Sequence, residues 1–134
     1  MSSFVPTGFA TITPYLMVND AEGFLVFLTD VLGGEELQVT RDDSGVVHAE
    51  VRVLGSVLEF SEAREPWPAT AACLHCYVPD ADAVMARMLE AGCTLLYDVT
   101  EHPYGERSGG VADRWGVRWF VATVTDMAKR TGNA

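Results

Sequence analysis

The stretch YLMVNDAEGFLVFL, residues 15–28, has a counterpart in HCYVPDADAVMARM, residues 75–88. In both stretches a strand-like segment ends in a valine, and an aspartate follows two positions later. The two valines, Val18 and Val78, stand at an offset of 60 residues. An aspartate in this place can cap a helix by accepting hydrogen bonds from its first amides. The chain therefore contains a strand followed by a helix twice.

The similarity continues beyond the two predicted helices. Each helix ends at glycine, within VLGG at 31–34 and EAGC at 90–93, as a left-handed helix cap prefers. Farther along, LGSVLEF at 54–60 matches WGVRWFV at 115–121 at an offset of 61 residues. Turn residues divide the rest of each half into strands, expected at about 35–41, 46–54 and 56–61 and at about 93–100, 108–113 and 117–125.

This pattern predicts an α+β fold of two tandem βαβββ modules in a single domain, residues 1–134. The first module covers about 10–61 and the second about 72–125, and the linker at 62–71 contains prolines that suit an extended connection. The helix of each module covers one face of its sheet and leaves the other face bare. Pairing the modules then forms a curved mixed sheet around a cleft.

The composition is that of a globular protein, and it narrows the choice of partners. Of the 134 residues, 49% are hydrophobic and 21% charged, and the formal net charge is -10. Such a surface repels phosphate backbones, which disfavours nucleic acid, and it attracts cations. We recognise neither an apolar run long enough for a membrane span nor a signal peptide, so we expect a cytoplasmic protein without a membrane partner.

The three cysteines, Cys73, Cys76 and Cys93, are odd in number, which argues against a disulfide framework. CLHC at 73–76 has the spacing of some zinc and redox sites. Its surroundings alternate like a strand, however, so we expect Cys73 and Cys76 on opposite faces. This arrangement disfavours one ion shared by the motif.

The same alternation indicates which strand residues enter the cleft. In the strand at 46–54, Val47, Ala49, Val51 and Val53 should pack against the helix, which leaves the residues between them facing the cleft. The polar and aromatic strand residues assigned to the cleft in this way are Tyr15, His48, Glu50, Arg52, Glu59, Cys73, His75 and Tyr77.

Several of these side chains also have a plainer structural interpretation. His48 and His75 can be wall residues that are hydrogen-bonded to their neighbours. Glu59 can pair with Arg52 or His48 in a buried polar network. Glu50 and Glu59 share the cleft face of adjacent strands, but the sequence does not fix the distance between them.

The stretch HPYGERSGGVADRWGVRW, residues 102–119, predicts the last hairpin of the second module. YGERSG enters one strand, and DRWG turns into the next. We expect Tyr104 and Arg107 at the mouth of the cleft and Trp119 beneath the helix. Trp115 in the turn is either a ligand contact or simple packing.

Taken together, these strings resemble the vicinal oxygen chelate superfamily, which contains glyoxalases, extradiol dioxygenases and bleomycin-resistance proteins. The chain is most similar to its PhnB-like branch, through TPYL at 13–16, HAE at 48–50 and the hairpin from Tyr104 to Trp119. The resemblance covers about 10–125 and implies the glyoxalase/bleomycin resistance fold. The chain departs from the branch where the usual Pro, Phe and His are replaced by Arg114, Trp115 and Val117, so a role of that histidine does not transfer.

Metal-using members of the superfamily place one ligand on each of the first, fourth, fifth and eighth strands, usually His or Gln, then Glu, His and Glu. The resemblance puts these positions at Thr13, Glu59, Cys73 and Phe120. Only Glu59 keeps a usual ligand, so we expect no metal and no other cofactor. The alternative is one divalent metal ion held by Glu59, His75 and His48 after a shift of register.

We therefore predict a metal-free homodimer of the drug-resistance type that binds or sequesters a small, planar or cationic molecule. Planar ligands stack on aromatic rings, and cations gain from aromatic faces and carboxylates. The predicted ligand-binding residues are Tyr15, His48, Glu50, Arg52, Glu59, Trp67, Cys73, His75, Tyr77, Tyr104, Arg107, Trp115 and Phe120.

Two alternatives to a binding protein stay open. The first is a metal-dependent enzyme, a lyase, isomerase or dioxygenase, in which Glu59 and His75 hold the ion. Glu50 or His48 is then the general base, although the sequence assigns no catalytic residue with certainty. The second is a scaffold that binds a partner protein and has no small ligand.

Overall fold

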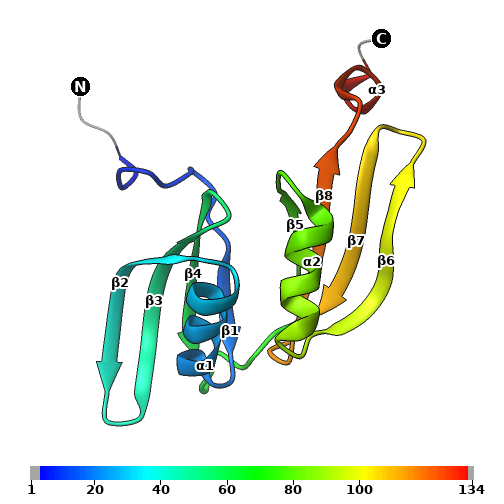
Figure 1. Cartoon of the computed structure of the whole chain (residues 1–134). Coiled ribbons are helices and arrows are strands. Elements are labelled where there is room, and N and C mark those ends of the chain that lie inside the picture. Colours follow the sequence, from blue (N-terminus) through cyan, green and yellow to red (C-terminus); the bar gives the residue numbers. More distant parts are fainter. Residues whose placement is uncertain (1–3, 133–134) are drawn as a thin grey trace. The chain divides into compact units, whose positions relative to one another are not determined.

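The computed structural model describes residues 4–132, which form two compact units that divide between Thr70 and Ala71 (Figure 1). Each unit contains one four-stranded sheet and a helix that packs on it. Within the described part of the chain, no helix has both the length and the apolar character needed to cross a lipid bilayer.

The first unit is a βαβββ module. Its elements are β1 (Tyr15–Val18), α1 (Ala21–Val26), the π-helical turn η1 (Phe27–Val31), β2 (Glu35–Asp42), β3 (Gly45–Val53) and β4 (Ser56–Glu62). The strands lie in the order β1-β4-β3-β2, and β1 runs parallel to β4 whereas the other neighbours are antiparallel. Figure 1 shows α1 lying across one face of this sheet.

Two carboxylates hold the start of α1 against the sheet. Asp20 caps the helix, as predicted, by accepting a hydrogen bond from the amide of Gly23 at 3.0 Å. Glu62, the last residue of β4, accepts bonds from two amides at the start of the helix at 3.0 and 2.8 Å. Phe24 is thereby brought against Phe60, and the two rings meet edge to face with their centroids 4.9 Å apart.

The second unit repeats this architecture and adds a short C-terminal helix. Its elements are β5 (Ala72–Tyr77), α2 (Ala81–Glu90), β6 (Thr94–His102), β7 (Glu106–Ala112), β8 (Val117–Val124) and α3 (Met127–Thr131). The strands lie in the order β5-β8-β7-β6, with β5 parallel to β8 and the other neighbours antiparallel. The strand order of the first unit is therefore reproduced position for position.

The helix face of the second sheet carries its core. Asp80 caps α2 as predicted. Trp119 on β8 is fully buried, and its indole N–H donates to Asp113 at 2.9 Å. A side chain at Gly109 would meet Met85 of α2, so the odd-numbered residues of β7 face the helix.

The predicted α+β class and the two tandem βαβββ modules are confirmed, with small differences at the strand ends. β7 begins at Glu106, where the sequence predicted 108, because the chain reverses tightly at Gly105 with a φ of 89°. α3 was not predicted. It begins at Met127, and the preceding residue, Asp126, caps it by accepting a hydrogen bond from the amide of Lys129 at 3.1 Å.

The prediction that Val47 packs beneath the helix is wrong. Thr40 pairs with His48 but Arg41 pairs with Val46, which leaves Val47 as the extra residue of a β-bulge. Val46 takes the buried place with 1% of its surface exposed, and Val47 is only partly buried. Ala49, Val51 and Val53 pack as predicted, because the alternation resumes after the bulge.

Candidate functional site

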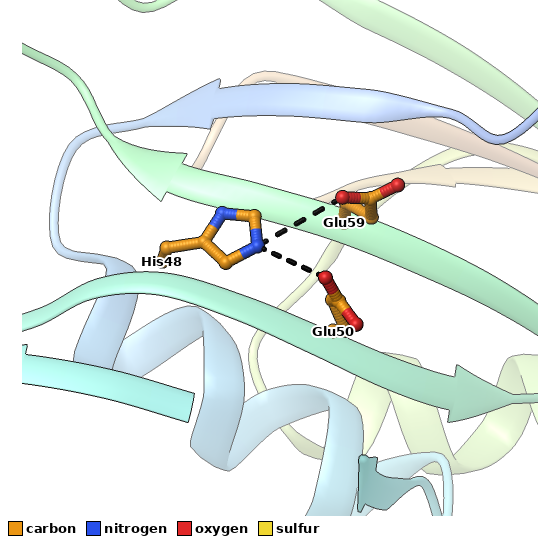
Figure 2. Close-up of side chains that lie close together, drawn as sticks. All are labelled: His48, Glu50 and Glu59. Carbon is orange, nitrogen blue, oxygen red and sulfur yellow. Dashed lines mark hydrogen bonds and ion pairs between the residues drawn. The ribbon is translucent and has the colours of Figure 1, made fainter. Parts of the chain in front are cut away.

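A histidine and two glutamates converge on the sheet of the first unit (Figure 2). His48 and Glu50 stand two residues apart on β3 and so share a face, and Glu59 on β4 is the direct ladder partner of Glu50. His48 Nε2 lies 3.3 Å from Glu50 Oε2 and 3.8 Å from Glu59 Oε1. The three side chains are 26%, 27% and 24% exposed, so solvent reaches them without surrounding them. We call these three residues the acidic cluster.

Two hydroxyl groups hold the other edge of the imidazole. The Tyr15 hydroxyl lies 3.1 Å from His48 Nδ1, and Ser61 Oγ lies 3.2 Å from the same nitrogen. The two hydroxyls are 2.5 Å apart. Because a hydroxyl can donate or accept, this pair accommodates either tautomer of His48. The ring is thus fixed with Nε2 directed at the carboxylates.

The charges of the acidic cluster are not balanced by its neighbours. Glu50 and Glu59 face each other across the ladder, where like charges destabilise a sheet. His48 is the group between them that can carry a positive charge. Arg52, two positions farther along β3, has its guanidinium 3.5 Å from Glu35 on β2. With His48 neutral, the cluster carries a negative charge.

An open pocket of about 500 Å³ adjoins the acidic cluster and shares Tyr15 and Ser61 with its hydrogen-bond network. Its lining residues are Tyr15, Met17, Val47, Ser61, Glu62, Arg64 and Trp67. Tyr15 and Trp67 are 47% and 63% exposed, so both present ring surface to a ligand. The pocket therefore combines aromatic and apolar surface with a nearby polar group.

The wall of this pocket is built by β1, the bulge in β3 and the loop after β4. In that loop the amide of Arg64 donates to the carbonyl of Trp67 at 2.9 Å, and a second bond returns from the amide of Trp67 to Arg64. This small bridge holds the indole beside the sheet. Val47 reaches the pocket because the bulge places it there, and Glu62 is occupied by the start of α1.

The residues predicted on β5 alternate as expected, but one of them is committed to a local network. Cys73, His75 and Tyr77 are exposed, and the rings of His75 and Tyr77 have centroids 4.7 Å apart. The Tyr77 hydroxyl donates to Glu106 at 3.1 Å, and Arg130 of α3 donates to both of them. Glu106 is 2% exposed, so Tyr77 and Arg130 serve a buried carboxylate.

Phe120 occupies the place in the second unit that Glu59 has in the first. It pairs with Gly110 on β7, just as Glu59 pairs with Glu50 on β3. The ring of Phe120 lies 6.3 Å from that of Tyr97, centroid to centroid. A side chain at Gly110 would come within 2.7 Å of the Tyr97 ring, which already fills that space. At the two positions that correspond to Glu50 and Glu59, the second unit therefore has no ionisable side chain.

The placement of Arg107 is a correction to the sequence prediction. Arg107 lies on the helix-covered face, in phase with Gly109, and its guanidinium donates to Asp82 of α2 at 2.7 and 3.0 Å. The hydrogen bonds and positive charge of Arg107 lower the pKa of Asp82. Arg107 therefore fastens the helix to the sheet. The prediction failed because β7 already begins at Glu106, so Arg107 lies within the strand and follows its alternation instead of standing in the turn.

The two aromatic residues predicted in the last hairpin have local partners. The Tyr104 ring stacks on His102 with centroids 5.1 Å apart, in the turn between β6 and β7. The Arg114 guanidinium lies 4.0 Å above the Trp115 ring, in the turn between β7 and β8. These contacts agree with the packing interpretation of Trp115.

Two of the three cysteines, Cys76 and Cys93, have little thiolate character. Cys73, Cys76 and Cys93 are free thiols. Burial raises the pKa of Cys76 to about 11. Burial, and then the negative charge of Asp113, raise the pKa of Cys93 to about 11. Reactive cysteines need a pKa low enough for the thiolate to form near neutral pH, so Cys76 and Cys93 are poor candidates for redox chemistry.

The four positions that the superfamily resemblance assigns to a metal do not supply a donor set. The Thr13 hydroxyl donates to the carbonyl of Ala10 at 3.1 Å, and Phe120 has no donor atom. Glu59 is grouped instead with His48 and Glu50. A metal site of the type implied therefore does not fit these residues. The alternative ligand His75 belongs to the second unit, so its association with Glu59 and His48 stays a prediction.

Sequence reasoning missed Ser61 and Arg64 as site residues. The register offers a signal for Ser61, which stands two positions after Glu59 and therefore on the same face. Nothing comparable indicates Arg64, whose position depends on the backbone bridge in the loop.

Comparison with known proteins agrees with this architecture. The chain matches the profile of the Glyoxalase/Bleomycin resistance protein/Dioxygenase superfamily over residues 8–121. The uncharacterized protein Mb0911c of Mycobacterium bovis is 28% identical over 122 residues, which cover 82% of this chain and 80% of that protein.

Two solved structures illustrate the shared fold. TioX from Micromonospora sp. ML1 has a TM-score of 0.72 at 21% identity, over 85% of this chain and 95% of that one. TnmS3, an antibiotic binding protein from Streptomyces sp. CB03234, has a TM-score of 0.68 at 20% identity, over 89% and 99% of the two chains. At these identities the likeness concerns the fold alone.

Proposed function

The chain belongs to the Glyoxalase/Bleomycin resistance protein/Dioxygenase superfamily, and we propose that it binds a small, planar, positively charged molecule in the pocket of its first module. The proposed role is sequestration without chemistry, and it requires neither a metal ion nor another cofactor. One observation carries this proposal: the Tyr15 ring lines the pocket while its hydroxyl contacts His48 of the acidic cluster. A ligand there meets aromatic surface and negative charge side by side.

The size and lining of the pocket suit a compact aromatic ligand. Its volume of about 500 Å³ lies within the range of about 300–1,000 Å³ that small-molecule sites occupy. Tyr15 and Trp67 supply rings on which a planar molecule can stack, with a gain of about 0.5–1.5 kcal/mol for each well-placed pair. Met17 and Val47 extend the apolar surface.

The charge distribution favours a cation. The His48 ring lies between Tyr15 and the carboxylates of Glu50 and Glu59. In addition, the formal net charge of the whole chain is -10. Such a field raises the local concentration of cations and speeds their association. Arg64 also lines the pocket and brings one positive charge, which the two carboxylates of the cluster and the net charge of the chain outweigh.

The superfamily supports a role in drug resistance. Its description includes bleomycin resistance proteins, and TnmS3 is described as an antibiotic binding protein. We propose the same type of activity for this chain, with the small molecule itself left open. Contributions of Cys73, His75 and Phe120 in the second unit remain predictions.

Branch membership and oligomeric state are further parts of the proposal. The strings TPYL at 13–16 and HAE at 48–50 support assignment to the PhnB-like branch. A homodimer is supported by apolar side chains on the edge strand β6, where Leu95, Leu96 and Tyr97 are exposed. Sedimentation equilibrium tests the dimer, and a single species with the mass of one chain across the concentration range refutes it.

A fluorescence titration of the full chain tests the binding proposal. The ligands are a fused-ring planar cation, such as ethidium, and a neutral fused-ring hydrocarbon alcohol of similar size. We expect saturable quenching by the cation, because the exposed Trp67 lies in the pocket, and weaker binding of the neutral compound. Trp67→Phe should remove most of the quenching, since Trp119 is buried and Trp115 lies in the β7–β8 turn of the second unit, beneath the Arg114 guanidinium.

Paired variants locate the ligand. Tyr15→Ala should weaken binding about tenfold or more, because it removes both a stacking surface and the contact with His48. Val26→Ala is the matched control, because the exposed fraction of Val26, 49%, is similar to the 47% of Tyr15, but Val26 lies on α1 and does not line the pocket. Absence of saturable binding across a broad panel of planar cations, or equal weakening by both variants, rejects the proposal.

The second candidate function is a metal-dependent lyase, isomerase or dioxygenase. The observation that favours it is the acidic cluster, in which an imidazole and two carboxylates stand within reach of one another. Glu50 or His48 is the proposed general base in such an enzyme; His48 contacts Tyr15 at the pocket wall, and Glu50 contacts His48. Turnover of a glyoxalase- or dioxygenase-type substrate that is lost in Glu59→Gln is the result that selects this function.

A further inference from the structure

We propose that His48, Glu50 and Glu59 form a site for one divalent transition-metal ion within the first module alone (Figure 2). This inference is independent of the small-molecule proposal, which requires no ion. It also differs from the ligand set that the superfamily resemblance implies, since two of its three residues lie on β3 and none lies in the second unit.

The distances between the donor atoms fit one ion. His48 Nε2 lies 3.3 Å from Glu50 Oε2 and 3.8 Å from Glu59 Oε1, and all three donor atoms lie within 4.8 Å of one another. Around a tetrahedral ion with bonds of about 2.1 Å, neighbouring donor atoms stand about 3.4 Å apart. The donor oxygens of the two carboxylates, at most 4.8 Å apart, need to approach by at most about 1.4 Å, which a rotation of the flexible glutamate side chains can supply.

The donor types match a borderline divalent ion. One imidazole nitrogen and two carboxylate oxygens suit zinc, manganese, cobalt or iron(II), whereas calcium and magnesium prefer oxygen alone. Three protein ligands leave at least one coordination position open, and the partial exposure of the cluster lets water or a ligand atom reach it. The site is therefore of the open type rather than the closed structural type.

The sheet supplies the rigidity that such a site needs. Glu50 and Glu59 are ladder partners, and His48 is fixed on the same face by the spacing of β3. When Nε2 binds an ion, Nδ1 carries the proton, and the oxygens of Tyr15 and Ser61 lie 3.1 and 3.2 Å away to accept it. Metal-bound histidines are oriented by such outer hydrogen bonds.

The unbalanced charge of the cluster is the second observation that points to a cation. The carboxylates of Glu50 and Glu59 face each other, and about a quarter of each side chain is exposed to solvent. The nearest arginine on β3, Arg52, pairs with Glu35 instead. A divalent ion neutralises both carboxylates and leaves His48 neutral, so it removes the repulsion that the ladder imposes. An organic cation uses the same carboxylates, and the two occupants should therefore compete.

Cobalt(II) titration of the full chain, freed of metal by a chelator, tests the site. The visible absorption of cobalt reports coordination, and calorimetry with zinc gives stoichiometry and affinity. We expect one ion per chain. Glu50→Gln and Glu59→Gln should each weaken binding about tenfold or more, because each replaces an anionic ligand by a neutral amide of the same shape.

His75→Ala is the matched control, because His75 is a histidine on an exposed strand position outside the cluster. Its affinity should equal that of the unaltered chain. The proposal is overturned by a failure to saturate up to about 1 mM ion, the weak limit of specific affinity. It is also overturned if both glutamine variants bind normally, or if His75→Ala alone loses the ion. None of these outcomes depends on whether the planar ligand binds.

Discussion

Replacing Glu50 by glutamine should stabilise the ion-free protein. Glu50 and Glu59 are ladder partners on the partly buried face of β3 and β4, and both point toward His48. Glutamine keeps the shape of the side chain and an oxygen that can accept a bond, but it removes one of the two facing charges. The substitution therefore isolates the electrostatic cost of the cluster.

The size of the effect follows from the separation of the carboxylates. At about 5 Å and an effective dielectric constant of about 20–40, two unit charges repel by about 2–3 kcal/mol. The bond from His48 Nε2 to Glu50 Oε2, at 3.3 Å, offsets this by about 1 kcal/mol. Since a quarter of each side chain is exposed, solvent screening reduces the remainder. We expect a net gain of about 1 kcal/mol in the free energy of unfolding.

Urea denaturation at pH 8 in a buffer with chelator measures this gain. Glu36→Gln is the matched control, because Glu36 is an exposed glutamate on β2 whose ladder partner is Val51. At low salt only Glu50→Gln should be more stable, and the difference should shrink in 1 M salt, where the screening length falls to about 3 Å. An unchanged or lower stability of Glu50→Gln at low salt, with the same denaturant slope, refutes the account of the cluster as self-repelling.

Three further outcomes are expected. Burial raises the pKa of Cys76 from 9.0 to about 11. Between these two pH values the folded chain keeps the thiol proton, whereas the unfolded chain loses it. The buried thiol therefore stabilises the fold fully below pH 9, and this contribution decreases as the pH rises toward 11. Urea titrations across this range should show a fall of up to about 2 kcal/mol that is smaller in Cys76→Ala. Asp113→Asn should cost about 2 kcal/mol in thermal denaturation, because the carboxylate accepts bonds from the amides of Trp115 and Val117 and from the indole of Trp119. Arg130→Ala should lower the midpoint of urea denaturation by leaving the buried carboxylate of Glu106 with Tyr77 alone, and adding Glu106→Gln should restore part of the loss.

The sequence predicts much of the fold because the two modules repeat the same local rules. Asp20 and Asp80 both cap their helices as expected, and the period-two alternation after the bulge correctly assigns His48, Glu50 and Glu59 to one face. These features depend on neighbours close in the chain or on strand phase, which sequence patterns report directly.

The features that were missed depend on details that alternation cannot encode. Val47 changes face because one extra residue enters β3. Arg107, expected at the cleft mouth, faces α2 because β7 already begins at Glu106, so that Arg107 lies within the strand and follows its alternation. A shift of one residue reverses every side chain in a strand, so small errors at strand ends become large errors in the site. Ser61 and Arg64 join the site through register and a loop bridge, both of which require coordinates.

The packing around Gly110 has a consequence for how the duplicated halves have diverged. One copy retains ionisable side chains at paired positions, whereas its twin has Gly110 opposite Phe120 with Tyr97 in the vacated volume. Restoring a glutamate at Gly110 alone would drive its side chain into the tyrosine ring, so Tyr97 would have to shrink as well. The difference between the halves is consequently difficult to reverse one mutation at a time, because the side-chain packing around Gly110 opposes the first step.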